Sequence, residues 1–127
     1  MKRPSPQRIK VSENKIQIAI LAYLRAVLHK SAIVLHIPNE GQRSKATSGL
    51  LSQLGLLPGA ADLLVIAPGP LTFFIECKTD IGRISEEQFE FRDACIGLSV
   101  PYFIARSIDD VQAALADLNI KTKDSRR

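Results

Sequence analysis

Two acidic residues and a lysine lie in apolar, strand-like segments, where charged side chains are uncommon. Asp62 opens one apolar run and Glu76-Cys77-Lys78 closes the next, with a Pro-Gly-Pro turn between them. Short apolar runs separated by proline and glycine predict a hairpin of adjacent strands. Because side chains alternate across a strand, Glu76 and Lys78 share one face, and strand pairing can bring Asp62 beside Glu76. Two carboxylates and an ammonium would then converge at one end of a sheet.

Such a group can hold a divalent cation, because Mg²⁺ prefers oxygen ligands and usually takes only one or two carboxylates. A lysine beside it could position or deprotonate a water and offset the charge that develops on a phosphate. This is the chemistry of phosphodiester hydrolysis. A Glu-x-Lys triplet alone is also typical of a surface salt bridge at a strand end. Acids on both strands of a hairpin, close to turn glycines and basic residues, favour an active site.

Eight elements are expected to position these residues. Hydrophobic periodicity and turn signals predict helices over about 13–29, 45–54, 85–98 and 107–118, and strands over about 33–37, 62–66, 71–78 and 100–105. Ser12, the capping box Ser85-Glu86-Glu87-Gln88 and Ser107 mark three helix starts. The order α-β-α-β-β-α-β-α predicts an α/β fold, a small mixed β-sheet flanked by helices, with the hairpin at its centre.

The ordered series of motifs resembles a known family. The chain is similar to the VRR-NUC (virus-type replication-repair nuclease) branch of the PD-(D/E)xK nuclease superfamily, in its short standalone form, from about Glu13 to about Leu115. The resemblance implies a restriction-endonuclease-like core. It is carried by Glu13 with Gln17, Asn39 to Arg43, Gly55, Pro58 to Leu63, Glu76-Cys77-Lys78, and Gly82 to Gln88.

The resemblance also implies roles for individual residues. Asp62, Glu76 and Lys78 fall on the catalytic acid, acid and lysine of the superfamily. Glu13 falls on a first-helix glutamate that helps to complete the metal site, and Gln88 on the glutamine that opens the helix beside the catalytic centre. Dependence on Mg²⁺ or Mn²⁺ and branched or flapped DNA as substrate are implied as well.

The chain departs from the family pattern just before the catalytic aspartate. The family usually has proline there, and this chain has Ala61. Loss of proline rigidity could loosen the turn, but the acid itself is present. Our hypothesis for the mechanism is that Asp62 and Glu76 bind the metal together with the carbonyl of Cys77, while Lys78 positions the attacking water.

Several of the remaining polar residues have an ordinary structural explanation beside the functional one. Gln17 and Gln88 could cap a helix or lie on a solvated helix face. Glu13 suits the first turn of a helix, where acids interact favourably with the macrodipole. His36, at a strand end, is expected to serve packing or capping.

Nucleic-acid contacts are expected from polar and basic residues around the hairpin. The loop from Asn39 to Lys45 offers amide, guanidinium and ammonium donors for a phosphate backbone, although a solvated turn explains it almost as well. We assign Gln17, Arg43, Lys45 and Arg83 as candidate nucleic-acid-binding residues.

Length and charge agree with a small nucleic-acid enzyme. The 127 residues predict one nuclease domain, with a core over about 12–118 and basic flexible ends over 1–11 and 119–127. The net charge of +4 favours polyanionic partners, DNA above all. No apolar stretch of signal-peptide or membrane-spanning type occurs, so we expect a cytoplasmic protein, encoded by a bacterium or a phage, without membrane partners. Cys77 and Cys95 are expected to be reduced, and a zinc site is not indicated.

Assembly and function leave alternatives open. So small a nuclease, with no recognition domain, is expected to act as a homodimer whose two sites address two strands of a junction. One competing function is a non-catalytic nucleic-acid-binding protein of the same fold. Another is a small restriction-type nuclease, which is weakened by the lack of extra segments that could read bases in the major groove.

Overall fold

The computed structural model describes residues 12–38 and 45–123 of the chain, with no side chains described for 45–48. The elements follow the order that the sequence predicts: α1 (Glu13–Val27), β1 (Ile33–His36), α2 (Lys45–Gln53), β2 (Leu63–Ala67), β3 (Leu71–Cys77), α3 (Glu86–Gly97), β4 (Tyr102–Ala105) and α4 (Ile108–Asp117).

The strands form one mixed sheet in the order β1-β2-β3-β4. β1 pairs with β2 and β2 with β3, both antiparallel, whereas β3 and β4 are parallel. The parallel pair is joined through α3, as parallel strands require a crossover connection. The predicted hairpin of β2 and β3 therefore occupies the middle of the sheet, and the predicted α/β fold with a small mixed sheet is confirmed.

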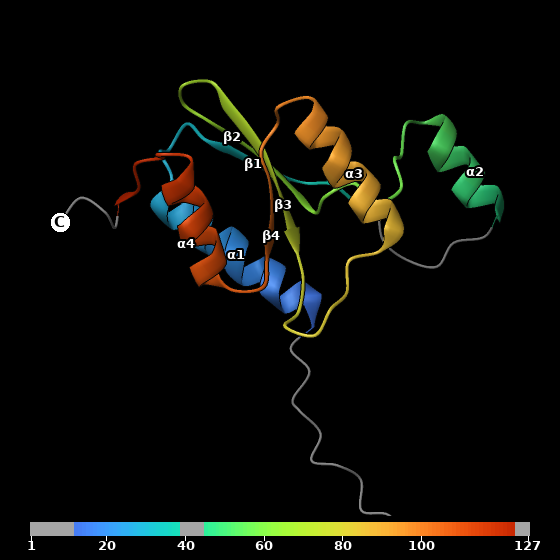
Figure 1. Cartoon of the computed structure of the whole chain (residues 1–127), viewed down its shortest axis with the longest axis horizontal. Coiled ribbons are helices and arrows are strands. Elements are labelled where there is room, and N and C mark those ends of the chain that lie inside the picture. Colours follow the sequence, from blue (N-terminus) through green and yellow to red (C-terminus); the bar gives the residue numbers. More distant parts are fainter. Residues whose placement is uncertain (1–11, 39–44, 124–127) are drawn as a thin grey trace, which may run out of the picture.

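Helices cover both faces of this sheet. α1 and α4 lie on one side and α3 on the other, while α2 stands farther out (Figure 1). The side of α1 and α4 holds the main core, in which Leu24, Phe73 and Ile75 are fully buried. On the other side Phe91 of α3 packs edge-on against Phe74 of β3, with ring centroids 5.1 Å apart. The two buried faces explain why β2 and β3 read as nearly continuous apolar runs.

The three serines expected to cap helices do so. The hydroxyls of Ser12, Ser85 and Ser107 each accept a hydrogen bond from the backbone N–H three residues later. This satisfies one of the N–H groups that the first turn of a helix leaves without a partner. α1 ends at Val27, two residues before the expected end, because Leu28 is already extended with ψ 159°.

The end of α3 also differs slightly from expectation. Ser99 adopts a left-handed conformation with φ 59°, and the Val100 N–H still bonds to the Cys95 carbonyl. Because Val100 thus belongs to the helix terminus, β4 begins at Tyr102 and not at residue 100.

The packed part of the chain continues beyond residue 118. Ile120 packs against the core cluster, its N–H bonds to the Leu115 carbonyl, and Thr122 is buried. Residues 119–123 are thus part of the folded body. Within the described ranges, no helix combines the length and the apolar character that a membrane crossing requires.

Candidate active site

The central hairpin brings the two predicted acids together. Leu63 pairs with Ile75, which places Asp62 and Glu76 beside each other at the same end of β2 and β3. Both side chains are withdrawn from solvent, with 8% of Asp62 and 2% of Glu76 exposed. The Cys77 N–H donates a 2.7 Å hydrogen bond to Oδ2 of Asp62 and so fixes this carboxylate across the strands.

Glu76 is the less well satisfied of the two carboxyl groups. Its Oε2 accepts a hydrogen bond of 3.3 Å from Nε2 of Gln88, but its buried Oε1 has no hydrogen-bond partner. Burial, and then the negative charge of Asp62, raise the pKa of Glu76 to about 9, although Lys78 acts in the opposite direction. A buried carboxylate beside another acid favours any cation that can reach both of them.

Lys78 follows on the same face of the chain. Its side chain is largely buried, and its Nζ lies 3.7 Å from Oε1 of Glu13, which comes from the first turn of α1. The Lys78 N–H bonds to the Ala105 carbonyl, so β4 holds the lysine backbone in place. The ammonium of Lys78 therefore lies beside the Glu13 carboxylate and also acts on Glu76.

These side chains line a common cavity of about 200 Å³. Its walls come from α1, the segment before β2, the end of β3 and the start of α3. The lining residues are Glu13, Pro58, Gly59, Ala60, Asp62, Glu76, Lys78, Ser85, Glu87 and Gln88. Four distant parts of the sequence thus meet at the place where the hairpin pattern predicts an active site.

Gln88 has a double function at the start of α3. Its Oε1 accepts from the Ser85 N–H at 2.9 Å, which completes the predicted capping box, while its Nε2 reaches Glu76. The side chain thus completes the capping box and also contacts one of the two buried acids.

The segment before Asp62 passes very close to α3. Gly59 has φ +82°, and a Cβ at this position would overlap the backbone of Glu87 and lie 2.8 Å from the Gln88 nitrogen. Ala61, which stands in place of the family's usual proline, is fully buried. Tight packing therefore holds this turn without the proline.

Gln17 is linked to the backbone of Asp62 through a histidine. Its Nε2 lies 2.8 Å from Nδ1 of His36, and the same ring nitrogen lies 3.0 Å from the Asp62 carbonyl oxygen. Gln17 thus has a hydrogen-bond partner at the surface of the fold. Sequence reasoning missed the contact between His36 and Asp62, because nothing in the sequence shows that the end of β1 meets the start of β2.

Comparisons with known proteins agree on the architecture. No protein-family model matches the sequence, and the comparison with curated proteins finds no match. Two solved structures are similar. One, a "VRR_NUC domain protein", is 18% identical, with 85% of this chain and 88% of that one covered and a TM-score of 0.68. The other, a "VRR_NUC domain", is 21% identical, with 83% and 94% covered and a TM-score of 0.57.

The chain has the VRR-NUC fold. The likeness extends over most of each chain. At this level of identity it establishes the architecture, and the chemistry must be argued from the side chains.

An oxygen-based metal site fits these side chains. Asp62 and Glu76 offer carboxylate oxygens at one place, and Oε1 of Glu76 is buried without a partner. Within residues 12–38 and 45–123, however, no three histidine, cysteine, aspartate or glutamate side chains gather to hold a metal by themselves. Glu13 lies against Lys78 instead of completing such a group. Mg²⁺ in this VRR-NUC fold would thus take few protein ligands, as is usual for this ion.

The candidate nucleic-acid contacts are only partly described. Arg83 is exposed in the loop between β3 and α3 of the VRR-NUC fold, where a polyanion can reach it. Lys45 opens α2, and its side chain lies outside the described part of the structure. Arg43 lies outside the described residues altogether.

A further arginine stabilises the loop that follows Lys78. Nη1 of Arg106 donates hydrogen bonds to the Thr79 carbonyl and, at 2.8 Å, to the Gly82 carbonyl. Its own N–H bonds to Oδ2 of Asp110 at the start of α4. These hydrogen bonds of Arg106, which we call the Arg106 clamp, were not predicted from the sequence. An arginine directly after a strand looks the same in a sequence whether it is bonded within the fold or solvated.

Proposed function

We propose that this chain is a metal-dependent nuclease of the VRR-NUC family that hydrolyses phosphodiester bonds in DNA. The observation that carries the proposal is Glu76, a buried carboxyl with an unpartnered oxygen, held beside Asp62 in a cavity that Lys78 also lines. Burying two acids and a lysine together is costly for a fold, and a carboxyl group with a strongly raised pKa in a cavity is typical of a functional site. The likeness to two solved VRR_NUC structures supports the same function.

The residues of the cavity take distinct roles in this proposal. Asp62 and Glu76, with the carbonyl of Cys77, would hold Mg²⁺ or Mn²⁺. When bound, the cation would polarise the phosphate and stabilise the leaving oxygen. Lys78 would position the attacking water near the phosphorus, and Gln88 would keep the Glu76 carboxylate aimed into the cavity.

We further propose branched or junction DNA as the substrate, in replication, repair or recombination. The cavity lies at one end of a small sheet, and the described residues include no additional domain to read base sequence. A nuclease of this kind must recognise its substrate mainly by shape and through phosphate contacts. The basic net charge suits such contacts.

The proposal is tested with purified protein and labelled four-way junction, 5′-flap, single-stranded and linear duplex DNA, each with Mg²⁺, Mn²⁺ or EDTA. We expect cleavage only with metal, strongest on a branched substrate, and none by the Glu76→Ala variant. Glu90→Ala, an exposed change on α3, is the matched control. Binding without cleavage in either metal would favour the non-catalytic alternative, and sequence-dependent cuts in linear duplex would favour a restriction-type enzyme.

Replacement of Lys78 tests the role of the ammonium. Because its charge acts on Glu76 and its side chain lines the same cavity as both acids, Lys78→Ala should reduce cleavage by about 10²–10⁴-fold. DNA binding, measured by anisotropy in EDTA, should change little. Lys15→Ala, which replaces an exposed lysine on α1, should cleave like the wild type. Normal turnover by Lys78→Ala would remove the lysine from the mechanism.

A homodimer is the assembly that we propose for the active enzyme. Two sites related by twofold symmetry would match the two strands cut in a four-way junction. Multi-angle light scattering at micromolar concentration should therefore give twice the chain mass of 14.0 kDa. A monomeric mass together with full activity would refute the homodimer and leave the nuclease proposal intact.

A further inference from the structure

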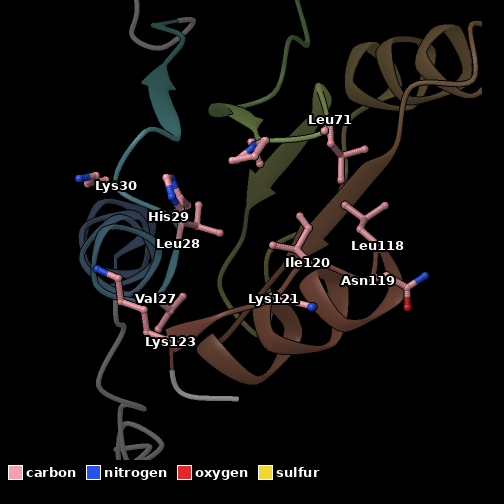
Figure 2. A pocket seen from close by; sticks show the side chains of 13 residues that line it. Val27, Leu28, His29, Lys30, Leu71, Leu118, Asn119, Ile120, Lys121 and Lys123 are labelled. Atoms are coloured by element: carbon pink, nitrogen blue, oxygen red, sulfur yellow. The ribbon is translucent and has the colours of Figure 1, made fainter. Parts of the chain in front are cut away.

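A wide hollow lies at the end of the sheet opposite the candidate active site. It measures about 670 Å³ and lies between the end of α1, the β2–β3 turn and the segment after α4 (Figure 2). Its floor is apolar, and the side chains that point into it include Leu28, Leu71, Leu118 and Ile120. A hollow of this size and lining is typical of a site that accepts the apolar side chains of a ligand.

The rim of the hollow is basic. Lys30, Lys121 and Lys123 are among its lining residues (Figure 2), and no aspartate or glutamate lines it within the described ranges. His29 adds a further donor. The Ser31 N–H donates to its Nδ1, so the proton of the neutral ring is on Nε2. We call this site, defined by these four basic residues and the apolar floor, the lysine-rimmed hollow.

The lysine-rimmed hollow is separate from the catalytic centre. Asp62 precedes β2, whereas Ala67, at the other end of the same strand, lines the hollow. Five strand residues span roughly 15 Å, so a ligand in the hollow leaves the cavity around Glu76 open. A ligand can therefore occupy the hollow while a substrate occupies the cavity around Glu76.

The lining indicates the chemistry of the ligand. A phosphate backbone needs donors but no apolar floor, and the described lining includes no phenylalanine, tyrosine or tryptophan ring on which a base could stack. A peptide with apolar side chains next to carboxylates matches both the apolar floor and the basic rim. Its apolar side chains pack against the floor, and its carboxylates pair with the lysines. We propose that the lysine-rimmed hollow binds a short acidic peptide segment of a partner protein, anchored by apolar side chains. This proposal is independent of the nuclease function.

The experiment uses the full chain and a fluorescein-labelled probe peptide, Asp-Asp-Glu-Leu-Ile-Leu-Glu, in anisotropy titrations at low salt. Two control peptides replace either the acids by their amides or the apolar residues by serine. The test variant is Lys121→Glu with Lys123→Glu, and its control is Lys15→Glu at the far end of α1. Backbone amide NMR shifts locate the bound peptide, and each variant is checked for folding by thermal denaturation.

We expect saturable binding of the probe, at least about tenfold weaker for the double variant and for both control peptides, and unchanged for Lys15→Glu. The shifts should centre on residues 118–123. Absence of saturable binding would overturn the proposal, as would equal binding of the serine peptide or shifts around Glu76. Displacement of the probe by single-stranded DNA would assign the site to nucleic acid. A dimer that the double variant dissociates would assign it to a second copy of the chain.

Discussion

Replacing Glu76 with glutamine should raise the melting temperature of the metal-free protein and abolish cleavage. Glutamine has nearly the same shape and can still accept from Gln88 with its amide oxygen. Its amide nitrogen can donate toward Asp62. In the wild type this position is taken by Oε1 of Glu76, a buried oxygen without a hydrogen-bond partner. The variant therefore removes the cost of keeping Glu76 buried beside Asp62, which the native site meets by holding a proton well above the ordinary pKa of the group; such a trade-off of stability for function is common at active sites.

The gain in stability should depend on pH in a defined direction. The pKa of Glu76 is about 9 in the fold, whereas its ordinary value is 4.5. Between these values the folded protein holds a proton that the unfolded chain has lost, so the contribution of Glu76 to stability falls as pH rises. The melting temperature of Glu76→Gln relative to wild type should thus increase steadily from about pH 5 to about pH 9 in EDTA.

Differential scanning fluorimetry across this pH range provides the measurement. Glu90→Gln, at an exposed site on α3, serves as the control and should follow the wild type throughout. Addition of Mg²⁺ should stabilise the wild type more than Glu76→Gln, because only the wild type offers the second carboxylate. A melting temperature of Glu76→Gln that stays below that of the wild type at about pH 8 would contradict the electrostatic explanation.

The second large effect is expected from Gly59→Ala. The added Cβ would overlap the Glu87 backbone, and this overlap cannot be relieved by rotating a side chain. The positive φ adds about 1–2 kcal/mol of strain for any L-residue with a Cβ. Relief requires the segment before Asp62 to move away from α3, which displaces the aspartate from its place beside Glu76. Cleavage should therefore be lost and stability reduced by more than about 3 kcal/mol.

Gly69→Ala is the matched control for this experiment. Gly69 also has a positive φ, of +114°, but no atom lies within 4 Å of the position that its new Cβ would occupy. The Gly69→Ala variant should lose only the stability that corresponds to the backbone strain, and its cleavage per folded molecule should be unchanged. Urea denaturation of both variants separates the two contributions. Equal losses of stability in Gly59→Ala and Gly69→Ala would show that the close contact with α3 does not contribute to stability.

The order and boundaries of the elements follow from local signals in the sequence. The capping serines, the Pro-Gly-Pro turn and the apolar runs act over a few residues, and the structure agrees with them except at the end of α1 and the start of β4. The meeting of Asp62 and Glu76 was also predictable, since a hairpin fixes the register of its own strands. Each of these inferences needs only neighbouring parts of the chain.

The rest of the site depends on contacts between distant segments. The pairing of Glu13 with Lys78 and the contact of His36 with Asp62 require that α1 and β1 are already placed against the hairpin. The raised pKa of Glu76 depends on burial that no short pattern reports. The Arg106 clamp likewise joins the end of β4 to the loop after β3.

The orientation of the Gln88 amide restricts what can replace this residue. In an ordinary capping box glutamate and glutamine are nearly interchangeable, because only the oxygen contacts the backbone N–H. Here the oxygen is committed to Ser85, so the opposite end of the amide must be a donor for Glu76. Glutamate would preserve the helix start and place a third acid against two others. Among homologous chains that keep both acids, this position should therefore tolerate neither glutamate nor any side chain too short to reach both partners.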